Sequence, residues 1–278
     1  MKEKRNVLLL ALPCTLTLLI AFIIPMVYTF IKALINDNLT YYTKFFTDPF
    51  YMKIFGNTIK LSLKTTLLTL VLGYPSAYFI ARTKSKIKSI LIIATIFPFL
   101  VSAVIRAYGW MVILGDSGIL NQFLLNAGII DSPIKIMYTE TAVMIGMAQL
   151  VLPYMILSIT GVIQNIDPNV ENAAKSLGAN PVQTFLKVTF PLSAPGVISG
   201  CILVFTMGMT SYITPQLLGG AQYLTMSTLV YSQIKTTYNL EFANAICYIL
   251  VFAILIFQIV ANNISNSVNK RLGSGKNA

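Results

Sequence analysis

The chain has 278 residues, of which 56% are hydrophobic and only 10% are charged, and its formal net charge is +11. Soluble domains carry about 25% charged residues, so this composition excludes an ordinary soluble protein and indicates an integral membrane protein. Histidine is absent, and it is the commonest general base and metal ligand, so the composition also argues against a metalloenzyme.

Six largely uncharged, apolar stretches follow one another along the chain. A helix that crosses a bilayer needs roughly 20 mostly apolar residues. We therefore predict an all-α integral membrane protein with a single domain over residues 1–278 and six transmembrane helices. The predicted spans are 7–31, 58–81, 89–114, 141–163, 195–217 and 242–262.

The first of these stretches could be mistaken for a cleavable signal sequence. Its uncharged run from Val7 to Ile31 is longer than the roughly 7–15 residues of a signal-sequence core, so we interpret it as an uncleaved span.

Basic residues set the orientation, because they stay preferentially on the cytoplasmic side. Taken together, segments 1–6, 82–88, 164–191 and 263–278 hold 12 of the 20 basic residues but only three acidic ones. This bias places both termini in the cytoplasm. Topology and lipid headgroups explain the positive charge without a nucleic acid partner.

Groups that carry chemistry are scarce. Cys14, Cys201 and Cys247 fall within predicted spans without paired spacing, so neither a disulfide nor a metal site is predicted.

The acidic residues lie in loops or at span ends, which argues against a hydrolase or a proton-driven carrier. Sodium coupling through backbone carbonyls stays open. The tail from Gly273 to Lys276 lacks most of a phosphate-binding loop, so no cofactor is predicted.

Prolines and one arginine interrupt the spans. Pro75, Pro98 and Pro153 are compatible both with ordinary kinked packing and with bent segments that line a path. Arg106 is followed by Tyr108 and Trp110. That arginine could snorkel to the outer boundary within an aromatic belt, or it could line an external gate.

Residues 164–191 form a polar cytoplasmic loop with its own helix signals. Asp167-Pro168 is a helix start, and Gly178 is suited to the residue after a helix end. Asn180-Pro181 repeats the start signal, with Gln183 placed to complete a capping box. We predict two short helices, the first ending near Leu177 and the second ending near Phe190, before Pro191.

The first loop helix would carry a small apolar face. Val170, Ala173, Ala174 and Leu177 recur at the spacing of one helix face. A helix that lies on a membrane surface would need larger apolar residues and more Lys or Arg. The pattern therefore favours docking to a partner protein.

The loop resembles a motif of bacterial ABC importer permeases, which reads E-A-A, three residues, G, nine residues, I-x-L-P. Asn172-Ala173-Ala174, Gly178 and Val188-Thr189-Phe190-Pro191 match it in every interval. Asn172 stands where Glu is usual, with Glu171 immediately before it, and Phe190 replaces Leu.

Nearly the whole chain is similar to permeases of spermidine/putrescine ABC importers. The resemblance is carried by "VLGYPSAYFIAR", "FPFLVSAVIRAYGW", "GILNQFLLNAGIIDSPIKIMYTETAVMIGM" and "LGANPVQTFLKVTFPLSAPGVISGCILVF". It implies a MetI-like fold in the bacterial cytoplasmic membrane, a second homologous permease, two copies of a cytoplasmic ATPase subunit and an external solute-binding protein. It also implies that the helix from Glu171 to Gly178 sits in a groove of the ATPase and moves when the ATPase dimer closes.

The implied cargo is a polyamine, a flexible multi-cation that aromatic faces can contact. The candidate path residues are Tyr74, Arg106, Tyr108, Trp110, Tyr154 and Tyr212. The spans have no central carboxylate, so any such contact would be weak. "GMTSYITPQLLGG" also resembles segments of importers for opine-like amino acid derivatives and phosphonates. A self-contained secondary carrier and a membrane scaffold are the alternatives from other classes.

Overall fold

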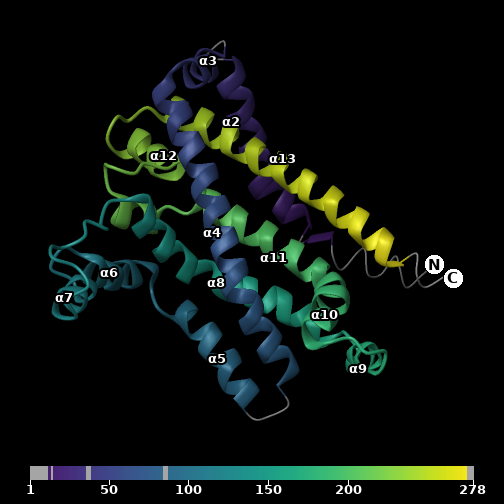
Figure 1. The fold of residues 1–278 in the computed structure, drawn as a ribbon. Helices are drawn as coiled ribbons and strands as arrows, with labels where there is room; N and C mark the ends of the chain where they lie inside the picture. The colour runs from purple at the N-terminus through teal and green to yellow at the C-terminus, as the bar shows by residue number, and fades with distance from the viewer. Residues whose placement is uncertain (1–11, 14, 36–38, 84–86, 274–278) are drawn as a thin grey trace. The chain divides into compact units, whose positions relative to one another are not determined.

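The computed structural model describes residues 12–13, 15–35, 39–83 and 87–273, and every regular element within them is a helix. Figure 1 shows their arrangement. The α-helices are α2 (Ile24–Ile35), α3 (Thr40–Thr47), α4 (Pro49–Arg82), α5 (Ile87–Leu100), α6 (Ala103–Leu114), α7 (Ile119–Asn126), α8 (Glu140–Gln164), α9 (Pro168–Ser176), α10 (Pro181–Thr184), α11 (Phe190–Thr210), α12 (Met226–Lys235) and α13 (Leu240–Gly273). Three π-helical turns complete the list: η1 (Leu19–Ile23), η2 (Phe185–Thr189) and η3 (Pro215–Gly219).

The chain forms two compact units, one of residues 1–52 with 229–251 and a larger one of residues 53–228 with 252–278. Aromatic contacts hold the smaller unit together. The Tyr248 hydroxyl donates to the Met26 carbonyl over 2.8 Å, and the Phe242 ring lies against the rings of Tyr41 and Tyr51. These contacts join the N-terminal helices to the first turns of α13.

In the larger unit, α8 packs against α11 through glycines. A Cβ at Gly196 would lie 2.8 Å from Val162, and one at Gly200 would lie 2.8 Å from the sulfur of Met155. Small residues let helix backbones approach closely in a membrane, where lipid supplies no hydrophobic driving force between helices. Helix α4 adds Tyr74, Ala77 and Ile80 to the same buried core.

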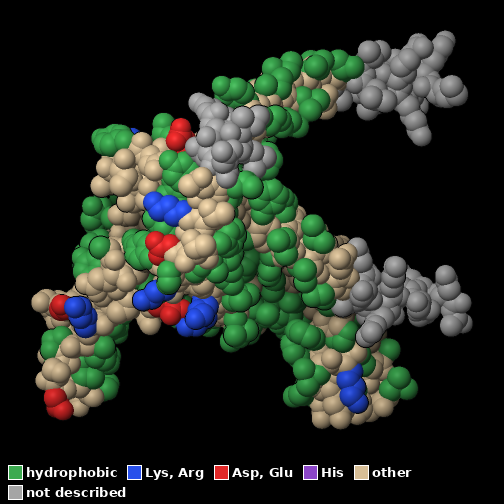
Figure 2. All heavy atoms as spheres, turned by 90° about the horizontal axis from the view of Figure 1, so that it is seen from above, with side chains coloured by type: hydrophobic (Ala, Val, Ile, Leu, Met, Phe, Trp, Pro, Cys, Tyr) green, Lys and Arg blue, Asp and Glu red, His purple; other side chains and the backbone are tan. Residues whose placement is uncertain are grey.

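Four helices are long and apolar enough to cross a membrane within the described residues, over Ala103–Asn126, Glu140–Gln164, Pro181–Thr210 and Leu240–Ser265. Shorter apolar helices cover Thr15–Ile31 and Ile87–Leu100. Large hydrophobic side chains such as Leu67, Ile93 and Leu100 are exposed, and hydrophobic groups cover much of the face in Figure 2. These surfaces suit contact with lipid. The six-span count and cytoplasmic termini stay predictions.

Helix α4 contains the predicted span 58–81, although it is rich in threonine. Several of its buried hydroxyls bond carbonyls one turn earlier in the same helix, at 2.8 Å from Thr58 to Ile54, 2.8 Å from Ser62 to Thr58 and 2.7 Å from Thr66 to Ser62. A hydroxyl satisfied in this way can lie inside a bilayer without an external partner.

The predicted third span, 89–114, is wrong as one continuous helix. It is divided into α5 and α6, with the break at Val101 and Ser102. The Ser102 hydroxyl accepts a hydrogen bond from the Val104 amide at the start of α6. Four residues after Pro98, a serine cap therefore starts a second helix, and an apolar composition alone does not reveal it.

Several residues used to predict topology lie outside the described part of the chain. They are Lys2, Lys4, Arg5, Lys84, Lys86 and Lys276, together with Cys14 and residues 7–11 of the predicted first span.

Candidate functional site

The loop helix α9 begins and ends as its sequence predicts. Asp167 Oδ1 accepts a hydrogen bond of 2.9 Å from the Asn169 amide, and Pro168 occupies the first turn. At the other end, Gly178 has φ +87°, and its amide donates to the Lys175 carbonyl over 2.9 Å. Glycine adopts this left-handed conformation without steric cost, so α9 has a definite length and direction.

The second loop helix also starts as predicted, but it does not end as predicted. Asn180 Oδ1 accepts from the Gln183 amide over 2.8 Å, and Gln183 Oε1 accepts from the Asn180 amide over 3.1 Å, which completes the capping box. The expected end before Pro191 is wrong, because α10 continues through η2 into α11 as one helix, Pro181–Thr210. The wider π-turn changes which carbonyls need an amide partner, so the missing amide of Pro191 is tolerated.

Glu171 points into the protein, not away from it. Its side chain is 9% exposed, and its Oε1 atom accepts hydrogen bonds from Arg82 Nη2 at 2.7 Å, Arg82 Nε at 3.2 Å and Thr189 Oγ1 at 2.9 Å. Arg82 Nη1 also donates to the Ile166 carbonyl over 3.1 Å. We call Arg82, Glu171 and Thr189 the anchor cluster. It connects α9 to the last turn of α4, the residues after α8 and the π-turn before α11.

The opposite side of the loop is apolar and exposed. Leu177 is 89% exposed, and Val170, Val182 and Leu186 are also exposed. Asn172 and Ala173 lie on the surface, whereas Ala174 is half-buried. The predicted docking face is therefore accessible over Val170, Ala173 and Leu177. Figure 1 places α9 and α10 at the same end of the larger unit as the end of α4 and the start of α5.

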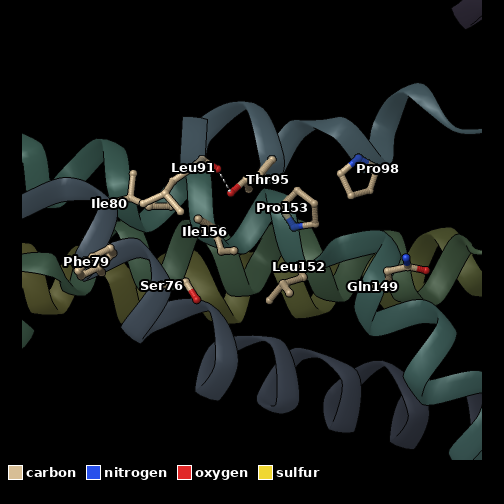
Figure 3. A pocket seen from close by; sticks show the side chains of 11 residues that line it. Ser76, Phe79, Ile80, Leu91, Thr95, Pro98, Gln149, Leu152, Pro153 and Ile156 are labelled. Carbon is tan, nitrogen blue, oxygen red and sulfur yellow. Dashed lines mark hydrogen bonds between the residues drawn. The ribbon is translucent and has the colours of Figure 1, made fainter. Parts of the chain in front are cut away.

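A cavity of about 360 Å³ lies between α4, α5 and α8 (Figure 3). Most of its lining is apolar, and no charged side chain takes part. The lining residues are Ser76, Phe79, Ile80, Leu91, Ala94, Thr95, Pro98, Gln149, Leu152, Pro153 and Ile156. Two of the three prolines that could line a path, Pro98 and Pro153, border this cavity, while Pro75 lies on an exposed part of α4.

Three of the predicted path residues contact this cavity's lining or its neighbours. Trp110 Nε1 donates to Gln149 Oε1 over 2.6 Å. Arg106 Nη1 donates to the Pro98 carbonyl, and the Tyr154 ring lies 4.6 Å from that of Phe99. Arg106 therefore joins the broken ends of α5 and α6, a role that neither sequence-based alternative included.

The other three path candidates lie elsewhere. Tyr74 is buried in the core, where its hydroxyl is 2.6 Å from Ser193 Oγ. Tyr108 is exposed on α6. Tyr212 is half-buried in the connection after α11, and its carbonyl accepts from the Gln216 amide over 3.0 Å. The structure thus separates these tyrosines from the cavity, which aromatic character alone could not do.

An ion pair at the start of α8 was not anticipated from the sequence. Lys64 Nζ lies 2.7 Å from Glu140 Oε1, with the lysine side chain 54% exposed, so its contribution to stability is small. Burial, and then the charge of Glu140, raise the pKa of nearby Tyr223. Its hydroxyl donates to the Asn57 carbonyl over 3.4 Å.

Metal-binding groups do not cluster in the described part of the chain, where no three His, Cys, Asp or Glu residues come together. Cys201 and Cys247 are free thiols there.

Comparison with known proteins identifies relatives of this chain. Residues 66–274 match the family model described as binding-protein-dependent transport system inner membrane component. The chain is 35% identical over 225 residues to the spermidine/putrescine transport system permease protein PotB of Escherichia coli (strain K12), covering 81% of this chain and 82% of that protein. It is 38% identical over 218 residues to the PotB protein of Haemophilus influenzae, covering 78% and 76%.

Among solved structures, the fold is similar to a chain of a bacterial alginate ABC transporter in complex with an alginate pentasaccharide-bound periplasmic protein. The TM-score is 0.77 at 20% identity, over 97% of each chain. This similarity concerns the fold.

Proposed function

The chain belongs to the family of binding-protein-dependent transport system inner membrane components, and we propose that it is the permease subunit of an ATP-driven importer of polyamines such as spermidine and putrescine. In this role it forms half of the translocation path in a bacterial cytoplasmic membrane. It works with a second permease, two cytoplasmic ATPase subunits and an external solute-binding protein. It is a transport component and not an enzyme.

The observation that carries the proposal is the position and surface of α9. A short helix with defined ends stands between α8 and α11, and it presents Ala173, Leu177 and Gly178 to its surroundings. An exposed leucine on a cytoplasmic loop is unfavourable in water and favourable in an apolar groove of a partner. We assign the loop residues Glu171, Asn172, Ala173, Ala174, Gly178 and Pro191 to ATPase coupling.

Transport then follows from displacement and not from chemistry within this chain. Closure of the ATPase dimer moves α9, and α10 passes the movement directly into α11 because the two share one continuous helix. The cavity between α4, α5 and α8 supplies a candidate section of the path, with Arg106, Trp110 and Tyr154 at its edge. Its lining offers amide, hydroxyl and aromatic groups but no carboxylate. A polyamine would therefore be held weakly and released, while the binding protein selects it.

The polyamine assignment is supported by the identity of 35–38% to PotB proteins over about four-fifths of the chain. It is tested by reconstituting the chain with its ATPase, second permease and binding protein in sealed vesicles. Spermidine or putrescine should stimulate ATP hydrolysis and accumulate inside. Stimulation by a phosphonate or an opine-like amino acid derivative instead would overturn the polyamine assignment. Accumulation of solute by this chain alone, without an ATPase, would overturn the importer assignment in favour of a secondary carrier.

A further inference from the structure

We infer that the anchor cluster of Arg82, Glu171 and Thr189 is the junction through which movement of α9 reaches α4, with these three side chains acting as positioning residues. The inference rests on the proposed function, in which α9 is the element that the ATPase moves. It also gives Glu171 a defined role, in which the carboxylate holds α9 to its own chain and leaves the partner contact to the exposed residues of the loop.

Distances along the chain show why a side-chain junction matters. Short connections join α9 to α8 and to α10, but Arg82 lies 89 residues before Glu171. Backbone continuity therefore carries movement of α9 to α8 and α11, whereas α4 needs a contact through space. Arg82 supplies it from the last turn of α4, with a long side chain that reaches both Glu171 and the Ile166 carbonyl.

The chemistry of the cluster makes it stiff. One carboxylate oxygen receives three hydrogen bonds, and the planar guanidinium directs its donors at fixed angles toward two acceptors. Hydrogen bonds to charged groups are about twice as strong as neutral ones, and burial limits screening by water. Sliding α9 along the end of α4 would leave a buried carboxylate or guanidinium without a partner, which is costly. The two helices therefore move together.

Thr189 gives the sharpest test, because its hydroxyl can be removed without changing the side-chain volume. Thr189→Val deletes one of the three donors to Glu171, and Thr189→Ser keeps it, so the serine variant is the matched control. Glu171→Gln and Arg82→Gln each remove one charge, and the double variant removes both.

The first measurement is hydrogen exchange of the α9 amides in the purified full-length chain, which needs no partner. Thr189→Val and Glu171→Gln should raise exchange over residues 168–177 by about tenfold, the change expected for loss of a hydrogen bond to a charged group. Thr189→Ser should leave it unchanged, and exchange in the buried middle of α8 should not respond. Unchanged exchange in Thr189→Val overturns the anchoring role, even if the Glu171 variant does not insert.

The second measurement is spermidine taken up per ATP hydrolysed in the reconstituted importer. Thr189→Val and Glu171→Gln should lower this ratio while the ATPase still co-purifies with the chain, and the double variant should recover part of the loss. Loss of co-purification in Glu171→Gln but not in Arg82→Gln would show instead that Glu171 is a partner contact. Faster hydrogen exchange with an unchanged ratio of spermidine uptake to ATP hydrolysis would show that the anchor cluster holds α9 but does not take part in transport. If the unaltered assembly shows no ATP-dependent uptake, the proposed function fails. The hydrogen-exchange measurement still tests whether the anchor cluster holds α9.

Discussion

The indole Nε1 of Trp110 donates a hydrogen bond of 2.6 Å to the side-chain oxygen of Gln149, and this contact sets the polarity of one wall of the cavity. An indole N–H can only donate. The oxygen of Gln149 therefore faces α6.

The bond between Trp110 and Gln149 predicts a measurable coupling between α6 and α8. Trp110→Phe and Gln149→Leu should each lower the stability of the purified subunit, and the double variant should lose less than the sum. We expect a coupling of about 1 kcal/mol, as for polar contacts between membrane helices. Thermal unfolding of the four proteins in detergent measures it, and additive losses would contradict the contact.

Replacing Arg106 distinguishes its structural role from a gate. Arg106→Leu leaves the Pro98 carbonyl at the α5–α6 break with only the Val101 amide, 3.4 Å away, as its donor and should cost about 1–3 kcal/mol. Arg106→Lys can still donate one bond and should cost less. Thermal unfolding of both variants provides the measurement. Normal stability with altered uptake in Arg106→Leu would favour the external gate.

Removing the Tyr74 hydroxyl should affect stability but not transport. Tyr74→Phe deletes the contact with Ser193 in the core and should cost about 1 kcal/mol. Because the ring remains and does not line the cavity between α4, α5 and α8, spermidine uptake per assembled complex should be unchanged. Tyr108→Phe, on the exposed face of α6, is the matched control and should change neither quantity. Reduced uptake with unchanged stability in Tyr74→Phe would contradict this prediction and indicate that Tyr74 lines the translocation path.

Gly178 tests whether the end of α9 must keep its left-handed turn. A Cβ at this position meets no atom within 4 Å, so Gly178→Ala isolates the effect of φ +87°. The strain is about 1–2 kcal/mol and should shift α9, lowering ATP-driven uptake while membrane insertion stays normal. Gly161→Ala, which also meets open space but lies inside α8, should leave uptake intact. Equal uptake by both variants would contradict a role for the turn.

Leu177 tests the docking surface directly. Leu177→Asn changes an 89% exposed side chain, so the fold should lose no more than about 0.5 kcal/mol. Co-purification of the ATPase subunit should fall, because the partner groove loses an apolar contact. Ile129→Asn, a similar change at an exposed position in the loop after α7, is the control. Undiminished ATPase binding in Leu177→Asn would place the interface elsewhere.

Local signals in the sequence predicted the loop well. Asp167, the Asn180–Gln183 pair and Gly178 act through hydrogen bonds and backbone angles that span only a few residues, so their spacing carries the information. The family assignment was predicted from the same stretch and its neighbours, and comparison confirms it.

Contacts between distant residues could not be predicted in this way. Nothing in the spacing of Arg82 and Glu171 indicates that they meet, because the path of α4 and α8 decides it. Arg106 stands out in the sequence as a charge within an apolar stretch, but its acceptor is the Pro98 carbonyl at a helix break that composition conceals. The π-turn before Pro191 was missed because the proline pointed to a helix end, whereas the wider turn accommodates it.

That π-turn has a mechanical consequence. From Pro181 to Thr210 the backbone never leaves the helical conformation, so the chain passes from the polar loop into the apolar helix α11 without a break. A rotation of the helix at Pro181 is not absorbed by any flexible segment before it reaches the far end of α11. The start of α10 and the far end of α11 are therefore expected to move as one rigid body.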